Sequence, residues 1–171
     1  MSGEAVLLEQ KEEHVLVLIM NRPERHHALN RELSGSLSDA IARAEADEEI
    51  RVIVLTGAGL KAFCAGADML EVSGVEKTSG EDRISAFDPI SKLSATPIPV
   101  IAAINGYCYG GGARLAVACD ILLASDNATF RLPGAEYGLV VAAASLPRLV
   151  GSSKAKELIF SARKFTADQA E

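Results

Sequence analysis

Short apolar runs alternate with helix-like stretches along this chain, and the alternation limits the folds that it can adopt. Val15–Met20 is a continuous apolar run, which predicts a strand buried on both faces. Residues 51–56, 98–104 and 120–125 predict three further strands. Strands separated by helices imply right-handed crossovers, so the sequence predicts an α/β architecture. With 171 residues the chain is long enough for one domain with a substantial core.

Three stretches between the strands have helical character. Asn30 can cap a helix whose apolar face is formed by Leu33, Leu37, Ile41 and Ala44. Residues 83–95 and 152–161 predict two more helices. The stretch 71–82 is polar, contains two glycines and has no periodicity, which predicts a mobile loop.

A run of three glycines, Gly110 to Gly112, stands between the strand at 98–104 and a helix-compatible stretch at 113–119. Glycine has no Cβ, so a ligand can approach the backbone closely at these positions. The first N–H groups of a helix have no intrahelical partner and point outward. Such groups can stabilise an oxygen that gains negative charge during a reaction, so the segment is a candidate for oxyanion chemistry.

Composition excludes several other functions. The net charge of -6 argues against nucleic acid as the main partner, because phosphate binding requires a basic surface. No apolar run approaches the ~20 residues that a membrane-spanning helix needs. Cys64, Cys108 and Cys119 are scattered and odd in number, which favours free thiols in a reducing compartment. We therefore expect a cytoplasmic protein without a membrane or nucleic-acid partner, and with no metal or bound cofactor.

The final residues have an unusual pattern. Thr166 and Gln169 have the spacing of a capping box, which predicts the start of a helix. Only two residues follow Gln169, and a helix that short is unfavourable by itself. We therefore expect a core domain over residues 1–165, with residues 166–171 beginning a C-terminal helical region that is missing.

Three segments together resemble the crotonase (enoyl-CoA hydratase/isomerase) family. They are residues 21–30, which read Asn-Arg-Pro-Glu-Arg-His-His-Ala-Leu-Asn, residues 63–69, and residues 105–112. The resemblance extends over nearly the whole chain and includes 119–121 and 149–151. It implies a spiral of ββα turns, an acyl-CoA thioester as substrate, and assembly into trimers or pairs of trimers. The helices that complete the family's trimer would lie beyond residue 171.

The resemblance also implies roles for particular residues. Ala67 and Gly111 match the two positions whose backbone N–H groups form the family's oxyanion hole. A second group matches the segments that contact the substrate or coenzyme A: Arg25, His26, Ala28, Ala65, Gly66, Asp68, Met69, Leu70 and Gly110. Within it, the Ala28 carbonyl would lie near the adenine. Arg22, Arg25, His26 and His27 would form a basic patch for the CoA phosphates.

Two positions depart from the hydratase pattern. Arg114 and Gly134 stand where the hydratases have the two glutamates that add water across a double bond. Arginine has a pKa above 12 and cannot act as a base, so ordinary hydration is not expected. Residues 139–148 also lack the carboxylate of the single-acid isomerases. Glu136 is a candidate replacement acid, although its family counterpart is a surface charge.

Several alternatives stay open at this level. Arg114 can clamp a carboxylate-bearing acyl group, or it can form a structural ion pair, for example with Glu136. Asp68 can act as an acid or can cap and fix its loop. Tyr109 can donate a proton or simply pack. The chain is then an acyl-CoA-processing enzyme, an acyl-CoA-binding protein without activity, or a structural subunit of a crotonase assembly.

Overall fold

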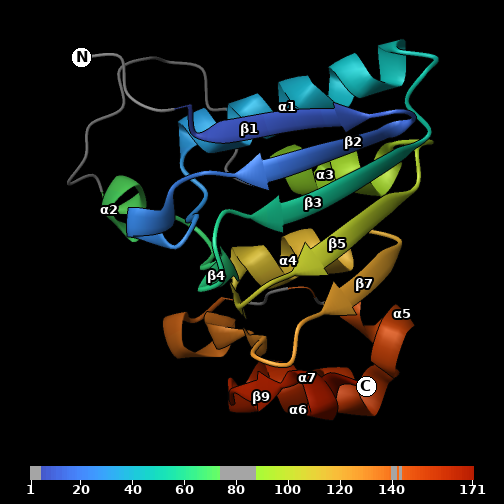
Figure 1. Ribbon diagram of the computed structural model, residues 1–171. Coiled ribbons are helices and arrows are strands. Elements are labelled where there is room, and N and C mark those ends of the chain that lie inside the picture. The colour runs from blue at the N-terminus through green and yellow to red at the C-terminus, as the bar shows by residue number, and fades with distance from the viewer. Residues whose placement is uncertain (1–4, 74–87, 140–141, 143) are drawn as a thin grey trace.

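The structure is a computed structural model that describes residues 5–73, 88–139, 142 and 144–171. Its first sheet has five strands in the order β1-β2-β3-β5-β7. Neighbouring strands are parallel except β1 and β2, which are antiparallel. The strands are β1 Leu7–Glu12, β2 Val15–Met20, β3 Val52–Gly57, β5 Val100–Ile104 and β7 Ile121–Ala124. In Figure 1 they form one twisted layer across the molecule.

A second sheet of four short strands follows the order β4-β6-β8-β9, with β9 antiparallel to β8. The strands are β4 Ala62–Cys64, β6 Tyr107–Tyr109, β8 Thr129–Arg131 and β9 Phe165–Thr166. Each of β3, β5 and β7 in the first sheet is followed directly by β4, β6 or β8 in the second. After β4 and β6 the chain returns to the first sheet through a helix. This repetition of ββα units confirms the predicted α/β spiral.

The helices lie on one side of the first sheet and around the second sheet (Figure 1). The α-helices are α1 Arg31–Ala46, α2 Met69–Val72, α3 Asp88–Ala95, α4 Gly111–Val117, α5 Leu146–Val150, α6 Ser152–Ser161 and α7 Ala167–Ala170. Two 3-10 turns are η1 Pro23–Arg25 and η2 Pro133–Tyr137. The core joins the first sheet to α1, α3 and α4, and its fully buried members include Leu18, Leu37 and Leu115. Among the described residues, no helix has the length and apolar character needed to cross a membrane.

The predicted first helix is confirmed together with its cap. The Asn30 side chain accepts a hydrogen bond of 2.9 Å from the Leu33 N–H. The four apolar residues at helical spacing are all buried against the sheet, namely Leu33, Leu37, Ile41 and Ala44. A polar cap and an apolar stripe therefore determine where α1 starts and which face it buries.

Most of the other predicted elements also appear. The strands expected at 51–56, 98–104 and 120–125 are β3, β5 and β7, and the helix expected at 152–161 is α6. The Thr166 capping box forms, because Gln169 Oε1 accepts the Thr166 N–H at 3.2 Å. The helix expected after the glycines starts two residues early, at Gly111.

Three expectations about these elements need adjustment. In β2, buried residues alternate with half-buried ones, so only one face is fully covered in the described part of the chain. The helix expected at 83–95 is α3 from Asp88 onward, and residues 83–87 lie outside the described residues. The stretch 71–82 was expected to be a loop, but α2 extends to Val72; residues 74–82 lie outside the described residues.

Candidate active site

Two backbone segments from different parts of the chain meet where the second sheet ends. Gly66 has a φ of +106°, and a Cβ placed there would stand 3.0 Å from the Gly111 nitrogen and 2.9 Å from the Tyr109 oxygen. A Cβ on Gly111 would stand 3.3 Å from the Ala67 nitrogen. Such contacts are too close for ordinary side chains, so glycine allows the two segments to pack backbone against backbone.

The N–H groups of Ala67 and Gly111 belong to the two segments that meet here, and they have no hydrogen-bond partners among the described residues. Both residues are half-buried or buried. A buried N–H without a partner is rare, because leaving it unpaired costs free energy. Two such donors beside one another form a site that an oxygen atom with partial negative charge can occupy.

A set of hydrogen bonds ties Ala67 and its neighbours to residues 26–29. The Leu29 N–H donates to the Gly66 carbonyl at 2.7 Å, and the Asp68 N–H donates to the Leu29 carbonyl at 3.0 Å. The Ala65 N–H donates to the His26 carbonyl at 3.0 Å. The two segments thus pair like adjacent strands, with an isolated bridge between Leu29 and Ala67.

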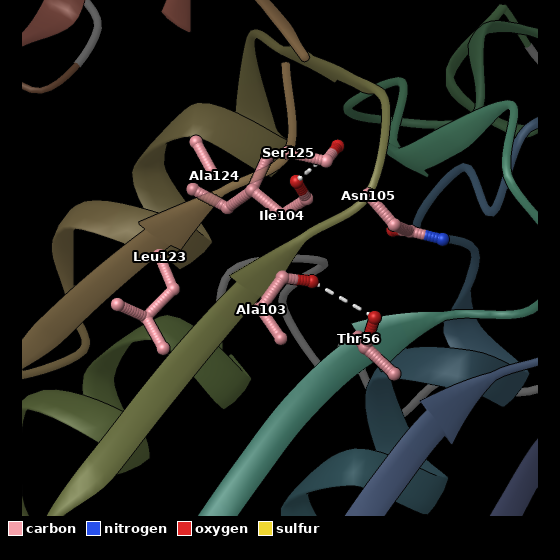
Figure 2. A pocket seen from close by; sticks show the side chains of 7 residues that line it. All are labelled: Thr56, Ala103, Ile104, Asn105, Leu123, Ala124 and Ser125. Atoms are coloured by element: carbon pink, nitrogen blue, oxygen red, sulfur yellow. Dashed lines mark hydrogen bonds between the residues drawn. The ribbon is translucent and has the colours of Figure 1, made fainter. Parts of the chain in front are cut away.

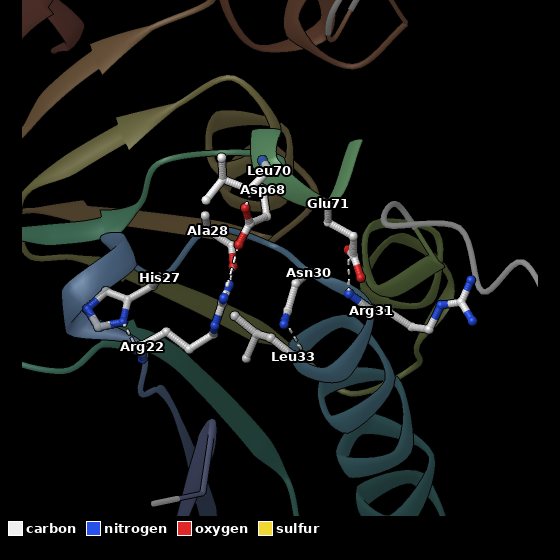
Figure 3. A network of polar contacts seen from close by, with 9 residues as sticks. All are labelled: Arg22, His27, Ala28, Asn30, Arg31, Leu33, Asp68, Leu70 and Glu71. Atoms are coloured by element: carbon white, nitrogen blue, oxygen red, sulfur yellow. Dashed lines mark hydrogen bonds and ion pairs between the residues drawn. The ribbon is translucent and has the colours of Figure 1, made fainter. Parts of the chain in front are cut away.

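A buried ion pair reinforces this connection (Figure 3). Arg22 Nη2 lies 3.0 Å from Asp68 Oδ2, and the two side chains are 10% and 4% exposed. The other guanidinium nitrogen of Arg22 donates to the Ala28 carbonyl. Asp68 Oδ1 accepts the Leu70 N–H at 3.2 Å and so caps α2. The structure gives Asp68 the capping and loop-fixing contacts that were one of the two alternatives for it.

The expected basic patch is smaller than the sequence suggested. Arg22 points into the protein and pairs with Asp68, so its charge is not available to phosphates at the surface. His27 is 1% exposed, and burial lowers the pKa of its imidazole below the ordinary 6.5. Arg25 and His26 are half-buried and remain the candidates for contact with coenzyme A.

His26 and His27 both adopt left-handed backbone conformations, with φ of 49° and 55°. His27 accepts the Arg22 N–H at Nδ1 (3.0 Å), and its Nε2 lies 3.0 Å from the Ala58 carbonyl. This pattern requires a neutral ring with the proton on Nε2. The His26 ring packs near Tyr107, with ring centroids 6.0 Å apart. These contacts hold a turn that is sterically unfavourable for residues other than glycine.

Arg114 and Gly134 occupy the positions where the resemblance expects the two hydratase glutamates. Arg114 is half-buried on α4, one turn after Gly111, and Gly134 is buried in η2. The Glu136 carboxylate pairs with Arg131, whose Nε also donates to the Ala162 carbonyl at 2.9 Å. The structure thus gives Glu136 a cationic partner in Arg131, five residues before it in the chain.

Two hollows lie away from the unpaired donors. One, of about 270 Å³, lies over the first sheet and is lined by Thr56, Ala103, Ile104, Asn105, Leu123, Ala124 and Ser125. Figure 2 shows that the Thr56 and Ser125 hydroxyls in it already bond to backbone carbonyls. A larger apolar hollow of about 820 Å³ lies between α4, β7 and the segment from α5 to α7. Ala67 and Gly111 line neither.

Comparison with known proteins decides the family. The sequence profile described as enoyl-CoA hydratase/isomerase matches residues 10–171. The chain belongs to the enoyl-CoA hydratase/isomerase family. A short-chain-enoyl-CoA hydratase from Clostridium acetobutylicum is 40% identical to this family member over 169 residues, which cover 96% of this chain and 64% of the relative. The recognition made from residues 21–30, 63–69 and 105–112 is confirmed.

Relatives of this enoyl-CoA hydratase/isomerase family member include different enzymes. A mitochondrial Delta(3,5)-Delta(2,4)-dienoyl-CoA isomerase from Mus musculus is 37% identical over 183 residues, covering 98% of this chain and 56% of the relative. The crystal structure of an enoyl-CoA hydratase from Bacillus anthracis superposes with a TM-score of 0.89 at 34% identity, covering 96% and 66% of the two chains. The chain thus spans between 56% and 66% of the length of these three relatives.

The sequence indicated the two candidate segments that the structure brings together, but it did not indicate the ion pair that connects their neighbours. The signal for the Arg22–Asp68 pair was weak, because the two residues are 46 positions apart and charged residues in loops are usually solvated. A hint was present in the position of each residue. Arg22 lies two residues after β2 and Asp68 lies two residues after the buried Gly66, so neither is far from the core.

Proposed function

We propose that this protein binds an acyl-CoA thioester and stabilises the enolate of its acyl group with the N–H groups of Ala67 and Gly111. The observation that carries the proposal is the pair of backbone donors, Ala67 and Gly111, beside the Gly66–Gly111 contact, neither of which has a partner in the described part of the chain. Family membership supports the substrate class, since the named relatives act on enoyl-CoA compounds.

The arrangement suits a carbonyl oxygen that becomes more negative during reaction. Removing the proton beside a thioester carbonyl moves charge onto its oxygen, and two fixed N–H dipoles stabilise that charge without reorganising. Backbone donors keep this property at any pH. Losing one such donor typically costs about 10²–10³-fold in rate.

We further propose that the reaction is not ordinary hydration. Syn-addition of water needs one group to activate the water and another to protonate the α-carbon. Arg114 and Gly134 supply neither, and Glu136 is engaged with Arg131. Isomerisation, hydrolysis or decarboxylation of a substrate that supplies its own acid fits the residues better. Glu136 stays the candidate proton carrier within the chain.

Crotonyl-CoA provides the first test. Loss of its conjugated thioester absorbance measures hydration, and calorimetric titration measures binding. We expect binding with slow or no hydration. Rapid hydration that persists in Glu136→Ala would contradict the argument from the missing glutamates. Absence of binding to any CoA thioester would overturn the whole proposal and leave only a structural subunit.

Two variants of one residue test the oxyanion site itself. Ala67→Pro removes the N–H without breaking a hydrogen bond, since that group has no protein partner in the described part of the chain. Ala67→Ser keeps the N–H and is the matched control. With the best thioester substrate, the proline variant should lose about 10²–10³-fold in kcat and the serine variant little. Equal rates for both would exclude Ala67 as a donor.

A binding protein without turnover is the second candidate function. Arg114 and Gly134 support this candidate. They stand where the hydratases have their two glutamates, while the Ala67 and Gly111 donors remain. Tight binding of several thioesters with no change in any of them would favour this candidate. Product formation from a single thioester at a steady rate would exclude it.

We also propose assembly into trimers or pairs of trimers in the cytoplasm. The family resemblance supports the assembly, and the three unpaired, buried thiols support a reducing compartment. Light scattering of the purified protein measures the mass directly. A monomer at high concentration would contradict the proposed assembly and leave the oxyanion proposal unaffected.

A further inference from the structure

Arg22 connects the two segments on which the Ala67 donor depends. Its Nη2 lies 3.0 Å from Asp68 Oδ2, and its Nη1 donates to the Ala28 carbonyl. The guanidinium is almost wholly buried between these two oxygens (Figure 3). A planar guanidinium presents its donors in a fixed fork, so it sets the spacing of both oxygens at once.

The direction of the Ala67 N–H follows from the bond on the other side of the same peptide. The Gly66 carbonyl accepts the Leu29 N–H at 2.7 Å. A trans peptide is planar and its C=O and N–H point in opposite directions. The Ala67 N–H must therefore point away from Leu29. A Cβ on Gly111 would stand 3.3 Å from the nitrogen of this N–H group.

Leu29 is held in turn by its neighbours. Its carbonyl accepts the Asp68 N–H at 3.0 Å, and the preceding carbonyl, of Ala28, is the one that Arg22 binds. Arg22 thus holds residues 28–29 and Asp68 at both ends of the short paired stretch. A shift of either end rotates the Gly66–Ala67 peptide between them.

We propose that Arg22 is a positioning residue of the oxyanion site, which fixes the orientation of the Ala67 N–H by joining the Ala28 carbonyl to the Asp68 carboxylate. This inference rests on the proposed role of Ala67 as a donor. On this proposal the Arg22–Asp68 ion pair contributes to stabilising the transition state. An ion pair that only stabilised the fold would not affect the Ala67 donor. A displacement of about 1 Å in such a group can cost on the order of 10²-fold in rate.

The test measures how strongly the Ala67 and Gly111 N–H groups polarise a bound thioester carbonyl. Crotonyl-CoA labelled with ¹³C at the thioester carbonyl is bound to the protein, and the carbonyl stretch is measured by isotope-edited infrared spectroscopy. Hydrogen bonds that polarise the carbonyl lower its stretching frequency. The reading needs no turnover, so it applies to an enzyme and to an inactive binding protein alike.

Asp68→Asn removes the charge opposite Arg22 and keeps an oxygen for the Leu70 N–H. The matched control is Glu71→Gln, the same chemical change on the same helix, where the carboxylate instead accepts the Arg31 N–H at 2.9 Å. Arg22→Lys keeps the buried positive charge but loses the fork. We expect Asp68→Asn and Arg22→Lys to lose most of the frequency shift. Glu71→Gln should keep the shift.

The outcomes separate the two proposals. No shift in the unmodified protein with crotonyl-CoA bound would overturn the proposed oxyanion site. A normal shift that persists in folded Asp68→Asn or folded Arg22→Lys would overturn the role of Arg22 alone. If Asp68→Asn does not fold, Arg22→Lys decides the matter, because it leaves a cation opposite Asp68. With a turned-over thioester, kcat should fall by on the order of 10²-fold in both variants while KM changes little.

Discussion

A methyl group placed on Gly112 would stand 2.1 Å from the carbonyl oxygen of Cys64. Cys64 ends β4, and Gly112 lies in the first turn of α4, so the strand and the helix touch through bare backbone at this point. Gly111, whose N–H is the second proposed donor, directly precedes Gly112 in the helix. Its position relative to Ala67 therefore depends on a contact that no side chain larger than hydrogen permits.

Gly112→Ala should destabilise the fold, because α4 must move away from β4 to admit the methyl group. Overpacking of this kind costs about 3 kcal/mol. Gly35→Ala is the matched control in the middle of α1, where an added Cβ meets nothing within 4 Å. It should raise the free energy of unfolding by about 0.5–1 kcal/mol. Urea unfolding of both variants measures the difference, and a stable Gly112→Ala protein would contradict the contact.

Asn30→Ala should weaken α1 at its start. The substitution removes the oxygen that accepts the Leu33 N–H at 2.9 Å. Loss of such a cap costs about 1 kcal/mol. Asn30→Asp keeps the acceptor and should retain most of the stability. Thermal unfolding followed by circular dichroism distinguishes the two, and equal losses in both variants would exclude the cap as the cause.

His27 should make stability depend on pH. Burial lowers the pKa of this imidazole in the folded state, so the folded protein favours the neutral ring. Above the ordinary pKa of about 6.5 both states are neutral and the stability is fully present. As the pH falls below that value, the unfolded state takes up a proton that the folded state resists, and stability is lost by at most about 1.4 kcal/mol per pH unit.

His27→Asn removes this titration, and asparagine tolerates the left-handed backbone at this position. Urea unfolding between pH 5 and pH 8 should show a flatter curve for this variant than for the unmodified protein. If stability depended on pH as steeply in His27→Asn as in the unmodified protein, a group other than His27 would be responsible for the dependence.

The three cysteines should be unreactive in the folded protein. Burial raises the pKa of the Cys64 and Cys119 thiols to about 12 and raises the pKa of Cys108 as well. The thiolate is the reactive form, and little of it exists at pH 8. A disulfide reagent such as dithionitrobenzoate should therefore label no cysteine in native buffer and three in denaturant. Rapid labelling without denaturant would show that the core opens locally.

Restoring both acids should create hydration activity. Arg114→Glu together with Gly134→Glu places carboxylates at the two positions where the resemblance expects them. The rate of crotonyl-CoA hydration should rise by about 10²-fold or more over the unmodified protein, the usual contribution of general acid–base catalysis. Each single substitution is the control and should give little. A folded double variant with no gain would show that the acids are not the missing part.

The sequence predicted the parts of the fold that carry a local signal. The apolar spacing from Leu33 to Ala44 and the capping Asn30 identified α1, and both bounds of α6 at Ser152–Ser161 were predicted. The glycines at 110–112 and the segment at 63–69 marked the two site segments before the structure joined them. These features depend on residues that are close in sequence.

Long-range features could not be predicted in the same way. Strands β4, β6 and β8 have three residues each, too few to show an alternating pattern. Arg22 and Asp68 come into contact only when the chain folds. From the sequence alone, both are expected to be charges at the surface.

The contact between Gly66 and Gly111 has a consequence for how the protein reaches its native state. Its two halves are separated by 45 positions, so the chain must close a long loop before Ala67 and Gly111 face each other. The rate of regaining ligand binding after dilution from denaturant should therefore lag behind the rate at which α1 regains its helical signal. Isolated peptides that carry either glycine segment alone should bind no thioester.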